Sequence, residues 1–370
     1  MTLPRITLLA ALLLAAPAAA QLQITPPATI PSPPPEKQKP KETAKEAAKE
    51  TAKDKPKAAP HTITKKKEAA PKPSASPSPT LPATVIPAPP TDNSNVDLVF
   101  GAYQRGQYKT AFDLASARAN AGDAKAMTML GELYSNAMGI RRDYAKAVEW
   151  YKRASDAGDR EAMFALAMLR IAGRGGPVDK GEAVKLMASA AKLGEPKAAY
   201  NLALLYLDGQ TLPQDVKRSA ELLRQAADAG LPEAQYALAT FYKEGTGVPK
   251  DPERSVRLLQ AASLADNVDA EVEYAIAMFN GTGTPKNQPA AVALLRKASR
   301  QGSAIAQNRL AWVLINGMGT PVDKVEGFKW HLVAKTSGKG DPELDKQLAD
   351  LPPDDRAKAE AAAKKWLGNK

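Results

Sequence analysis

The sequence predicts an all-α solenoid, that is, a row of stacked helix-turn-helix repeats behind a long segment that cannot form a core. The first observation is a period of 36 residues that returns six times between residues 123 and 338, with no insertion or deletion. The second is that each period holds two stretches with apolar residues at helical spacing. The third is that helix caps and turn glycines fall at the same places in nearly every period.

Residues 1–20 predict a secretory signal peptide. They contain one positive charge, Arg5, then an apolar run from Ile6 to Ala16 and a small-residue end at residues 18–20. This layout is typical of a cleaved signal, and the apolar run is shorter than the roughly 20 residues that a spanning helix needs. We therefore expect an exported protein, periplasmic or secreted, with no transmembrane segment after signal cleavage.

Residues 21–95 predict a disordered linker rich in Pro, Lys and Ala. The segment has 17 prolines, 12 lysines and 7 acidic residues, and it almost lacks large apolar side chains. Such a composition cannot offset the entropy of ordering the chain. Its net charge of +5 is compatible with weak attraction to a cell wall or another anionic surface.

The charge balance of the remainder argues against nucleic acid as a partner. The whole chain carries a formal charge of +11, but residues 96–370 hold only a thin excess of 38 basic over 33 acidic groups. A nucleic-acid-binding domain usually concentrates its basic residues on one face. The chain also has no cysteine, which excludes disulfides, thiolate metal ligands and cysteine nucleophiles.

Residues 96–122 predict an N-terminal helical cap, because Ala111 and Gly122 lie 36 residues before Ala147 and Gly158. The six repeats that follow are predicted to be 123–158, 159–194, 195–230, 231–266, 267–302 and 303–338. Each begins with a helix, which in five of the six repeats ends at a turn glycine; the first repeat has Ala137 there. A second helix then starts at a capping Asp or Asn, at 143, 179, 215, 251, 287 and 323. Columns of alanine allow the helices to approach closely and to share a continuous core.

The stretch "YKEGTGVPKDPERS", residues 242–255, resembles a phosphate-binding loop, but its setting favours a turn. A phosphate loop follows a strand and occurs once. Gly245-Thr246-Gly247 follows a predicted helix, and three other repeats carry the same Gly-x-Gly. We therefore expect Gly245 to end one helix with a positive φ and Asp251 to cap the next.

Blocks such as "LPEAQYALATFYKEGTGVPKDPERSVRLLQAASLAD" resemble the Sel1-like repeat, a relative of the tetratricopeptide repeat. The resemblance covers residues 123–338 and rests on the first-helix "A-x-x-x-L-G/A-x-x-Y", the turn "G-x-G-V-x-x-D" and the second-helix "A-V-x-W-Y-x-x-A". It implies a right-handed α-solenoid that binds a protein or peptide in its concave groove. Residues 339–370 predict capping helices: a short helix, a break at the two prolines 352 and 353, and a last helix that Trp366 holds to the array.

Two patterns suggest an enzyme, and both have simpler interpretations. Ser189 and Lys192 fit the S-x-x-K of penicillin-recognising enzymes, but they occupy an ordinary helix end and lack the accompanying motifs. His331 stands in a column that otherwise holds Tyr, Met or Leu, so it is expected to be packed in the core. Asp208 and Glu244, 36 residues apart, could form a carboxylate pair. We expect no catalytic residues, no metal and no cofactor; the alternative is an envelope enzyme acting on peptidoglycan or β-lactams.

The candidate site is an apolar stripe on the concave face, at positions that tetratricopeptide arrays use for binding. Whether these side chains line a groove or pack within the superhelix is left open by the sequence. The predicted function is an exported scaffold or adaptor that binds a partner segment there, in envelope assembly or in regulation of a signalling receptor. The predicted contact residues are Phe164, Met168, Tyr200, Leu204, Tyr236, Ile276, Phe279 and Trp312.

Overall fold

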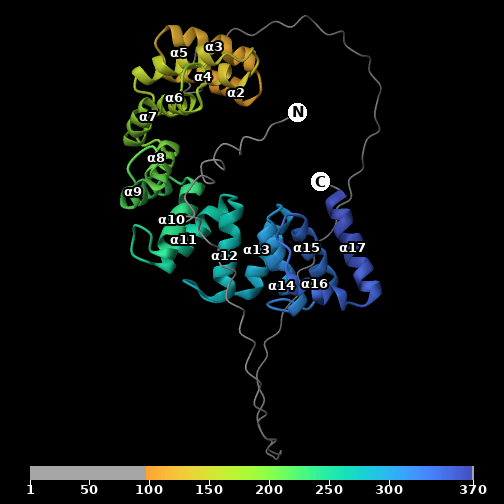
Figure 1. The fold of residues 1–370 in the computed structure, drawn as a ribbon. Coiled ribbons are helices and arrows are strands. Elements are labelled where there is room, and N and C mark those ends of the chain that lie inside the picture. Colours follow the sequence, from red (N-terminus) through yellow and green to blue (C-terminus); the bar gives the residue numbers. More distant parts are fainter. Residues whose placement is uncertain (1–96, 369–370) are drawn as a thin grey trace, which may run out of the picture. The chain divides into compact units, whose positions relative to one another are not determined.

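The computed structural model describes residues 97–368, and every regular element in that part of the chain is an α-helix. The expected signal peptide and linker lie outside these residues. The chain forms two separate units, of which the second begins at residue 95 and contains all the described helices. Within that unit the helices follow one another in chain order along an arc (Figure 1).

The described helices pair as the 36-residue period predicts. The first helices of the six repeats are α4 Ala124–Asn136, α6 Arg160–Ala172, α8 Pro196–Asp208, α10 Pro232–Glu244, α12 Val268–Asn280 and α14 Ala304–Asn316. The second helices are α5 Tyr144–Asp156, α7 Lys180–Lys192, α9 Val216–Asp228, α11 Pro252–Leu264, α13 Gln288–Arg300 and α15 Lys324–Thr336. Each helix packs on the one before and the one after it, which confirms the solenoid.

The caps predicted for the second helices are present in all six repeats. Each Asp or Asn accepts a hydrogen bond from the backbone N–H three residues later, as Asp251 does from Arg254 at 2.9 Å. This bond satisfies one of the backbone donors that a helix start leaves free. The sequence alone was sufficient here because a capping bond is local.

The turn between the two helices depends on two glycines for different reasons. Gly245 ends α10 with φ of +82°, so it supplies the left-handed residue that terminates the helix. Gly247, with φ of +66°, is also a point of close approach: a Cβ there would lie 2.7 Å from the carbonyl oxygen of Val216, in the first turn of α9. The stretch that resembles a phosphate loop is therefore a turn between two helices, and its second glycine packs against the preceding repeat.

The core is a series of buried clusters along the row of helices. Alanines occupy the closest approaches, and leucines such as Leu166, Leu238 and Leu310 fill the space between the paired helices. The first repeat has Gly131 at a position where the other five repeats have alanine. The ring of Tyr151 fills the space that a methyl group would take there, 2.6 Å from the position of a Cβ on Gly131. Large and small residues thus exchange places between facing helices, which keeps the packing dense.

Two further helices lie at each end of the array. At the start lie α2 Leu98–Gln104 and α3 Tyr108–Asn120, and at the end α16 Pro342–Ala349 and α17 Pro353–Gly368. α17 packs along α15, and Trp366 meets the ring of Trp330 edge to face at 5.1 Å. The two helices are thus separate at the two prolines, and Trp366 contacts α15; its role in holding the end of the array stays a prediction.

His331 is fully buried under the C-terminal cap, as its apolar column indicated. Its Nε2 lies 2.8 Å from Oδ1 of Asp345 in α16, and Lys335 Nζ lies 2.8 Å from the same oxygen. The hydrogen bonds from Lys335 and then His331 hold the pKa of Asp345 below its usual value. Asp345 therefore joins α16 to α15.

Because the pKa of Asp345 is lower in the folded than in the unfolded chain, its contribution to stability is present above the unfolded value and is lost as pH falls through the folded one. We expect the C-terminal cap to lose stability below about pH 4 and the Asp345→Asn variant to lose less over the same range. Urea unfolding followed by tryptophan fluorescence at pH 5 and pH 3 measures this. An equal loss in both proteins would contradict the role of Asp345.

Candidate functional site

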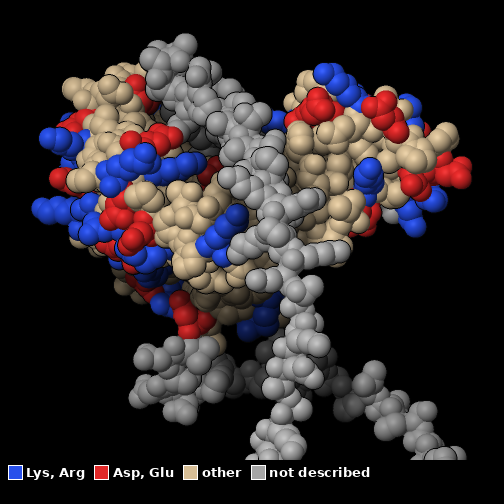
Figure 2. Space-filling view, turned by 90° about the horizontal axis from the view of Figure 1, so that it is seen from below, with Lys and Arg blue, Asp and Glu red and all other residues tan. Residues whose placement is uncertain are grey.

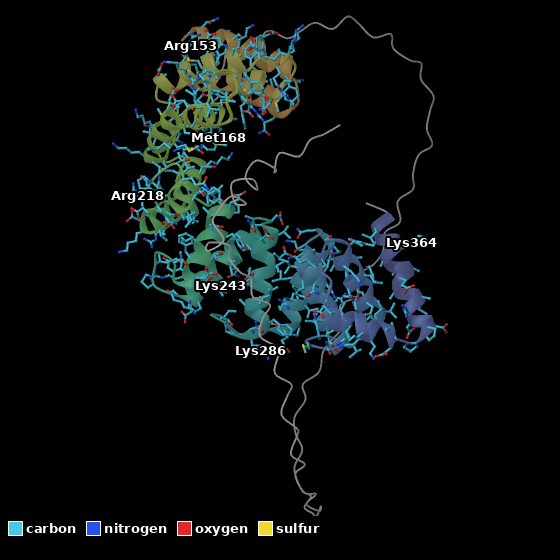
Figure 3. All side chains as sticks on the ribbon, in the orientation of Figure 1. Arg153, Met168, Arg218, Lys243, Lys286 and Lys364 are labelled. Atoms are coloured by element: carbon cyan, nitrogen blue, oxygen red, sulfur yellow. The ribbon has the colours of Figure 1, made fainter. Side chains whose placement is uncertain are left out.

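The candidate site is the inner side of the arc, which is lined by the first helices of the repeats. In the N-terminal half of the array α4, α6 and α8 lie inside α5, α7 and α9 (Figure 1). Met168 of α6 points to the inner side, whereas Arg218 of α9 lies on the outer side (Figure 3). We call the side of the first helices that carries Met168 and the equivalent residues of the other repeats the inner face.

All eight residues of the predicted stripe are half-buried. They lie on α6, α8, α10, α12 and α14, and most pack against core residues while keeping part of their surface in solvent. The structure thus answers the open question with an intermediate state: these side chains support the core and also form the floor of the inner face. Whether they bind a partner stays a prediction.

The two ends of the inner face are covered by the caps. Trp312 donates its indole N–H to Oδ2 of Asp341 at 3.0 Å, and Asn308 donates to the carbonyl of Lys339 at 3.1 Å. At the other end, Tyr103 of α2 donates to Glu132 of α4 at 2.7 Å. The uncovered part is therefore the inner face of α6, α8, α10 and α12. Trp312 has a structural role that the sequence did not reveal.

The floor between α8 and α12 is aromatic and lies among carboxylates. Burial, followed by the carboxylates of Glu273, Asp269 and Glu244, raises the pKa of Tyr236 to about 12. Burial, and then the carboxylate of Glu233, raises the pKa of Tyr200. Both phenols are therefore neutral at physiological pH, and several acidic side chains from successive first helices converge on them.

Sequence reasoning named Asp208 and Glu244 but missed Glu233, Asp269 and Glu273. For Glu233 and Asp269 the missed signal is the column that starts at Lys125, where Lys125 forms ion pairs with Asp159 at 2.9 Å and Glu161 at 3.2 Å. The same column holds Glu233 and Asp269 in the fourth and fifth repeats. The contact between Lys125 and Glu161 shows that side chains at equivalent positions in neighbouring repeats can touch. Glu233 and Asp269 occupy such positions, and both are acidic.

The enzyme-like residues do not meet in a shielded site. Ser189 and Lys192 are both exposed on α7, whereas activation of a nucleophile by lysine requires a desolvated environment. Residues 97–368 contain no group of three or more His, Asp or Glu side chains arranged to hold a metal ion. On the side shown in Figure 2, basic and acidic side chains are interspersed rather than gathered by sign.

A stacked array with a continuous inner face and capped ends defines the class of helical-repeat binding proteins. The family model for the Sel1 repeat matches residues 124–159, 160–195, 196–231, 232–267, 268–303 and 304–338. The chain belongs to the Sel1 repeat family. Proteins of this family are generally scaffolds for protein–protein interaction rather than enzymes.

Solved structures with similar folds support this assignment. The protective antigen c5321 of uropathogenic Escherichia coli, described as displaying an SLR fold, is 24% identical with a TM-score of 0.62 over 74% of this chain; the match spans 63% of the antigen's own length. A Sel1 repeat protein of Oxalobacter formigenes is 25% identical with a TM-score of 0.59, over 66% of this chain and 100% of that one. Comparison with curated proteins gives no match.

Within residues 97–368, no helix combines the length and the apolar character that crossing a bilayer requires.

Proposed function

We propose that this protein is an exported adaptor that binds a segment of a partner protein along the inner face of α6, α8, α10 and α12. The observation that carries the proposal is the uncovered stripe of half-buried apolar and aromatic side chains between the two caps. Aromatic side chains in such positions supply large contact area at low entropic cost, and they are frequent interface anchors. Export is supported by the signal-like residues 1–20, and envelope assembly or receptor regulation is the setting that we propose.

The binding test compares an inner-face variant with an outer-face variant. Tyr236→Ala removes an anchor from the floor, so affinity for the partner should fall by roughly 10-fold or more, as for a typical interface anchor. Arg218→Ala, on the outer side, should leave affinity unchanged. Trp312→Ala is a poor test because it also removes the bond to Asp341.

Crosslinked complexes captured from periplasm identify the partner, and titration of the purified partner then gives the affinities. Thermal unfolding of both variants shows whether the array stays intact. If partner binding is equal in Tyr236→Ala and the unmodified protein, the inner face is not the site. Turnover of muropeptides or a β-lactam that disappears in Ser189→Ala would instead establish the enzyme alternative.

The export proposal is tested separately by cell fractionation. We expect the mature protein in the periplasm with its N-terminus at Gln21, which intact mass measurement would show. A full-length protein in the cytoplasm would contradict it.

A further inference from the structure

Two arginines from neighbouring repeats meet at one buried tyrosine. Arg224 of α9 donates from Nη2 to the phenol oxygen of Tyr242 at 3.1 Å, and Arg254 of α11 donates from Nη1 to the same oxygen at 3.5 Å. The guanidinium carbon of Arg254 also lies 5.7 Å from the centre of the Tyr242 ring. Both arginines are exposed, whereas Tyr242 is buried in the last turn of α10. We call these three residues the arginine–tyrosine cluster.

The two positive charges of the cluster are only partly paired. Arg254 Nε lies 3.1 Å from Oδ2 of Asp251, whereas Arg224 forms no ion pair with a carboxylate of residues 97–368. Two exposed carboxylates are close to the arginines along the chain: Asp228 lies one turn after Arg224, and Glu253 directly precedes Arg254. Neither forms an ion pair within the part of the chain that the structure describes. The guanidinium of Arg224 is therefore available to an anion from solution.

The phenol of Tyr242 adds a third donor. Its oxygen accepts hydrogen bonds from both arginines, which leaves its own hydrogen to donate, and none of the described residues accepts it. Burial raises the pKa of Tyr242, but the hydrogen bonds and charges of Arg254 and Arg224 lower it below its usual value. Such surroundings favour negative charge at this point, whether on the phenol or on the oxygen of a ligand beside it.

Other repeats carry a carboxylate where the fourth repeat has its second arginine. In the sixth repeat Glu326 takes the place of Arg254, and its Oε2 pairs with Arg296 Nη1 at 2.7 Å. In the second repeat the same place belongs to Glu182, which pairs with Arg170 Nε at 2.7 Å. The fourth repeat alone among the six brings two arginines to this position. An anion is thus built into the second and sixth repeats but has to come from outside in the fourth.

We propose that the arginine–tyrosine cluster binds a phosphate group. A carboxylate has two oxygens and is satisfied by one arginine, as Glu326 is by Arg296. A tetrahedral phosphate presents oxygens in several directions, so it can accept from two guanidinium groups and a hydroxyl at once, and the guanidinium fork matches its geometry. The phosphate is either free or the headgroup of an anionic lipid.

The site goes beyond the proposed function, because neither arginine belongs to the inner face. Both lie on second helices, α9 and α11. Arg218, which is equivalent to Arg254 one repeat earlier, lies on the outer side of the array (Figure 3). Phosphate and a partner segment would therefore occupy different surfaces of the same array.

A titration with inorganic phosphate tests the binding. In purified, nitrogen-15-labelled protein, the Nε–H signals of Arg224 and Arg254 should shift and saturate, with half-saturation at roughly 1–10 mM because both side chains are exposed to water. Chloride at the same ionic strength should give no saturating shift. The signal of Arg296 is the internal control, since Glu326 already occupies its guanidinium.

Exchanging one arginine for a carboxylate gives a matched variant. Arg254→Glu places in the fourth repeat the pair that the sixth repeat already accommodates, so the array should stay folded. It should weaken phosphate binding, followed at Arg224, by roughly tenfold or more. Tyr242→Phe, which removes only the hydroxyl, should weaken binding by about threefold or more. Thermal unfolding checks each variant, and Arg224→Gln replaces Arg254→Glu if the latter is unstable.

Sedimentation with vesicles distinguishes the two sources of phosphate. Vesicles of phosphatidylglycerol and phosphatidylcholine are compared with vesicles of phosphatidylcholine alone, at low salt. Lysines elsewhere in the chain add a background that is equal in the unmodified protein and in Arg254→Glu. A loss of sedimentation in the variant assigns the site to the lipid headgroup, whereas a phosphate titration that alone depends on Arg254 assigns it to free phosphate. If neither measurement depends on Arg254, the proposal is wrong.

These measurements need no partner protein. Their failure therefore leaves the effect of Tyr236→Ala on partner binding untouched, and failure of that test leaves the phosphate titration untouched.

Discussion

Leu310→Ala should lower the free energy of unfolding by about 3–4 kcal/mol, the largest effect that we expect from a single conservative truncation in this chain. Leu310 has no exposed surface and lies in the cluster that joins α14 to α15, beside Leu314 and Phe328. The alanine would lose the transfer free energy of the side chain and leave a cavity. The surrounding helices are pinned on both sides by their neighbours, so they can close that cavity only in part.

The measurement suits this protein because three of its four tryptophans, at 312, 330 and 366, belong to the same C-terminal region. Urea unfolding followed by tryptophan fluorescence therefore reports on the part of the array that Leu310 supports. The matched control is Leu264→Ala, because Leu264 is 82% exposed and its truncation should change stability by less than about 0.5 kcal/mol. Equal effects of the two substitutions would show that this cluster does not hold the repeat together.

Gly247→Ala should cost about 3 kcal/mol, although alanine adds a single methyl group. Part of this cost is the positive φ of +66°, which a residue with a Cβ adopts only at a penalty of about 1–2 kcal/mol. The rest arises because the Cβ would lie 2.7 Å from the carbonyl oxygen of Val216, so the turn must move away from α9. The substitution therefore weakens the contact between two repeats rather than one helix.

Gly338→Ala separates the two causes. Gly338 has nearly the same φ, +72°, but nothing lies within 4 Å of a Cβ placed there. Its substitution should cost only the backbone penalty, and the difference between the two variants measures the clash. Chemical denaturation of both proteins in parallel gives the comparison. If the two substitutions lower the free energy of unfolding equally, Gly247 is needed only for its positive φ and not for its close contact with Val216.

The local features of the fold could be predicted because each depends on residues close together in the chain. Asp143 and Asp251 cap helices by bonding an N–H three residues away, and Gly245 ends a helix through its own φ. The 36-residue period then repeats these signals six times, so that an exception such as Gly209-Gln210-Thr211 does not obscure them. The position of His331 in an apolar column was sufficient to predict its burial.

The candidate site was predictable only in part. The columns that contain Met168 and Tyr236 could be assigned to one side of the first helices, because side chains three and four residues apart share a helix face. How far these side chains are buried depends on how closely successive repeats stack, which no single repeat encodes. The convergence of Glu233, Glu244, Asp269 and Glu273 on two tyrosines also requires three helices to be brought together.

The sequence by itself determined the repeat, its caps, its turns and the family, because periodic local signals need no knowledge of distant contacts. Only the tertiary structure decided which part of the inner face is open. It showed that Asp341 engages Trp312 and that Tyr103 engages Glu132, so the caps close both ends. It also showed that the carboxylates of Glu244, Asp269 and Glu273 surround Tyr236. The physical reason is that hydrogen bonds and charges act over a few ångströms in space, whatever the separation of the residues along the chain.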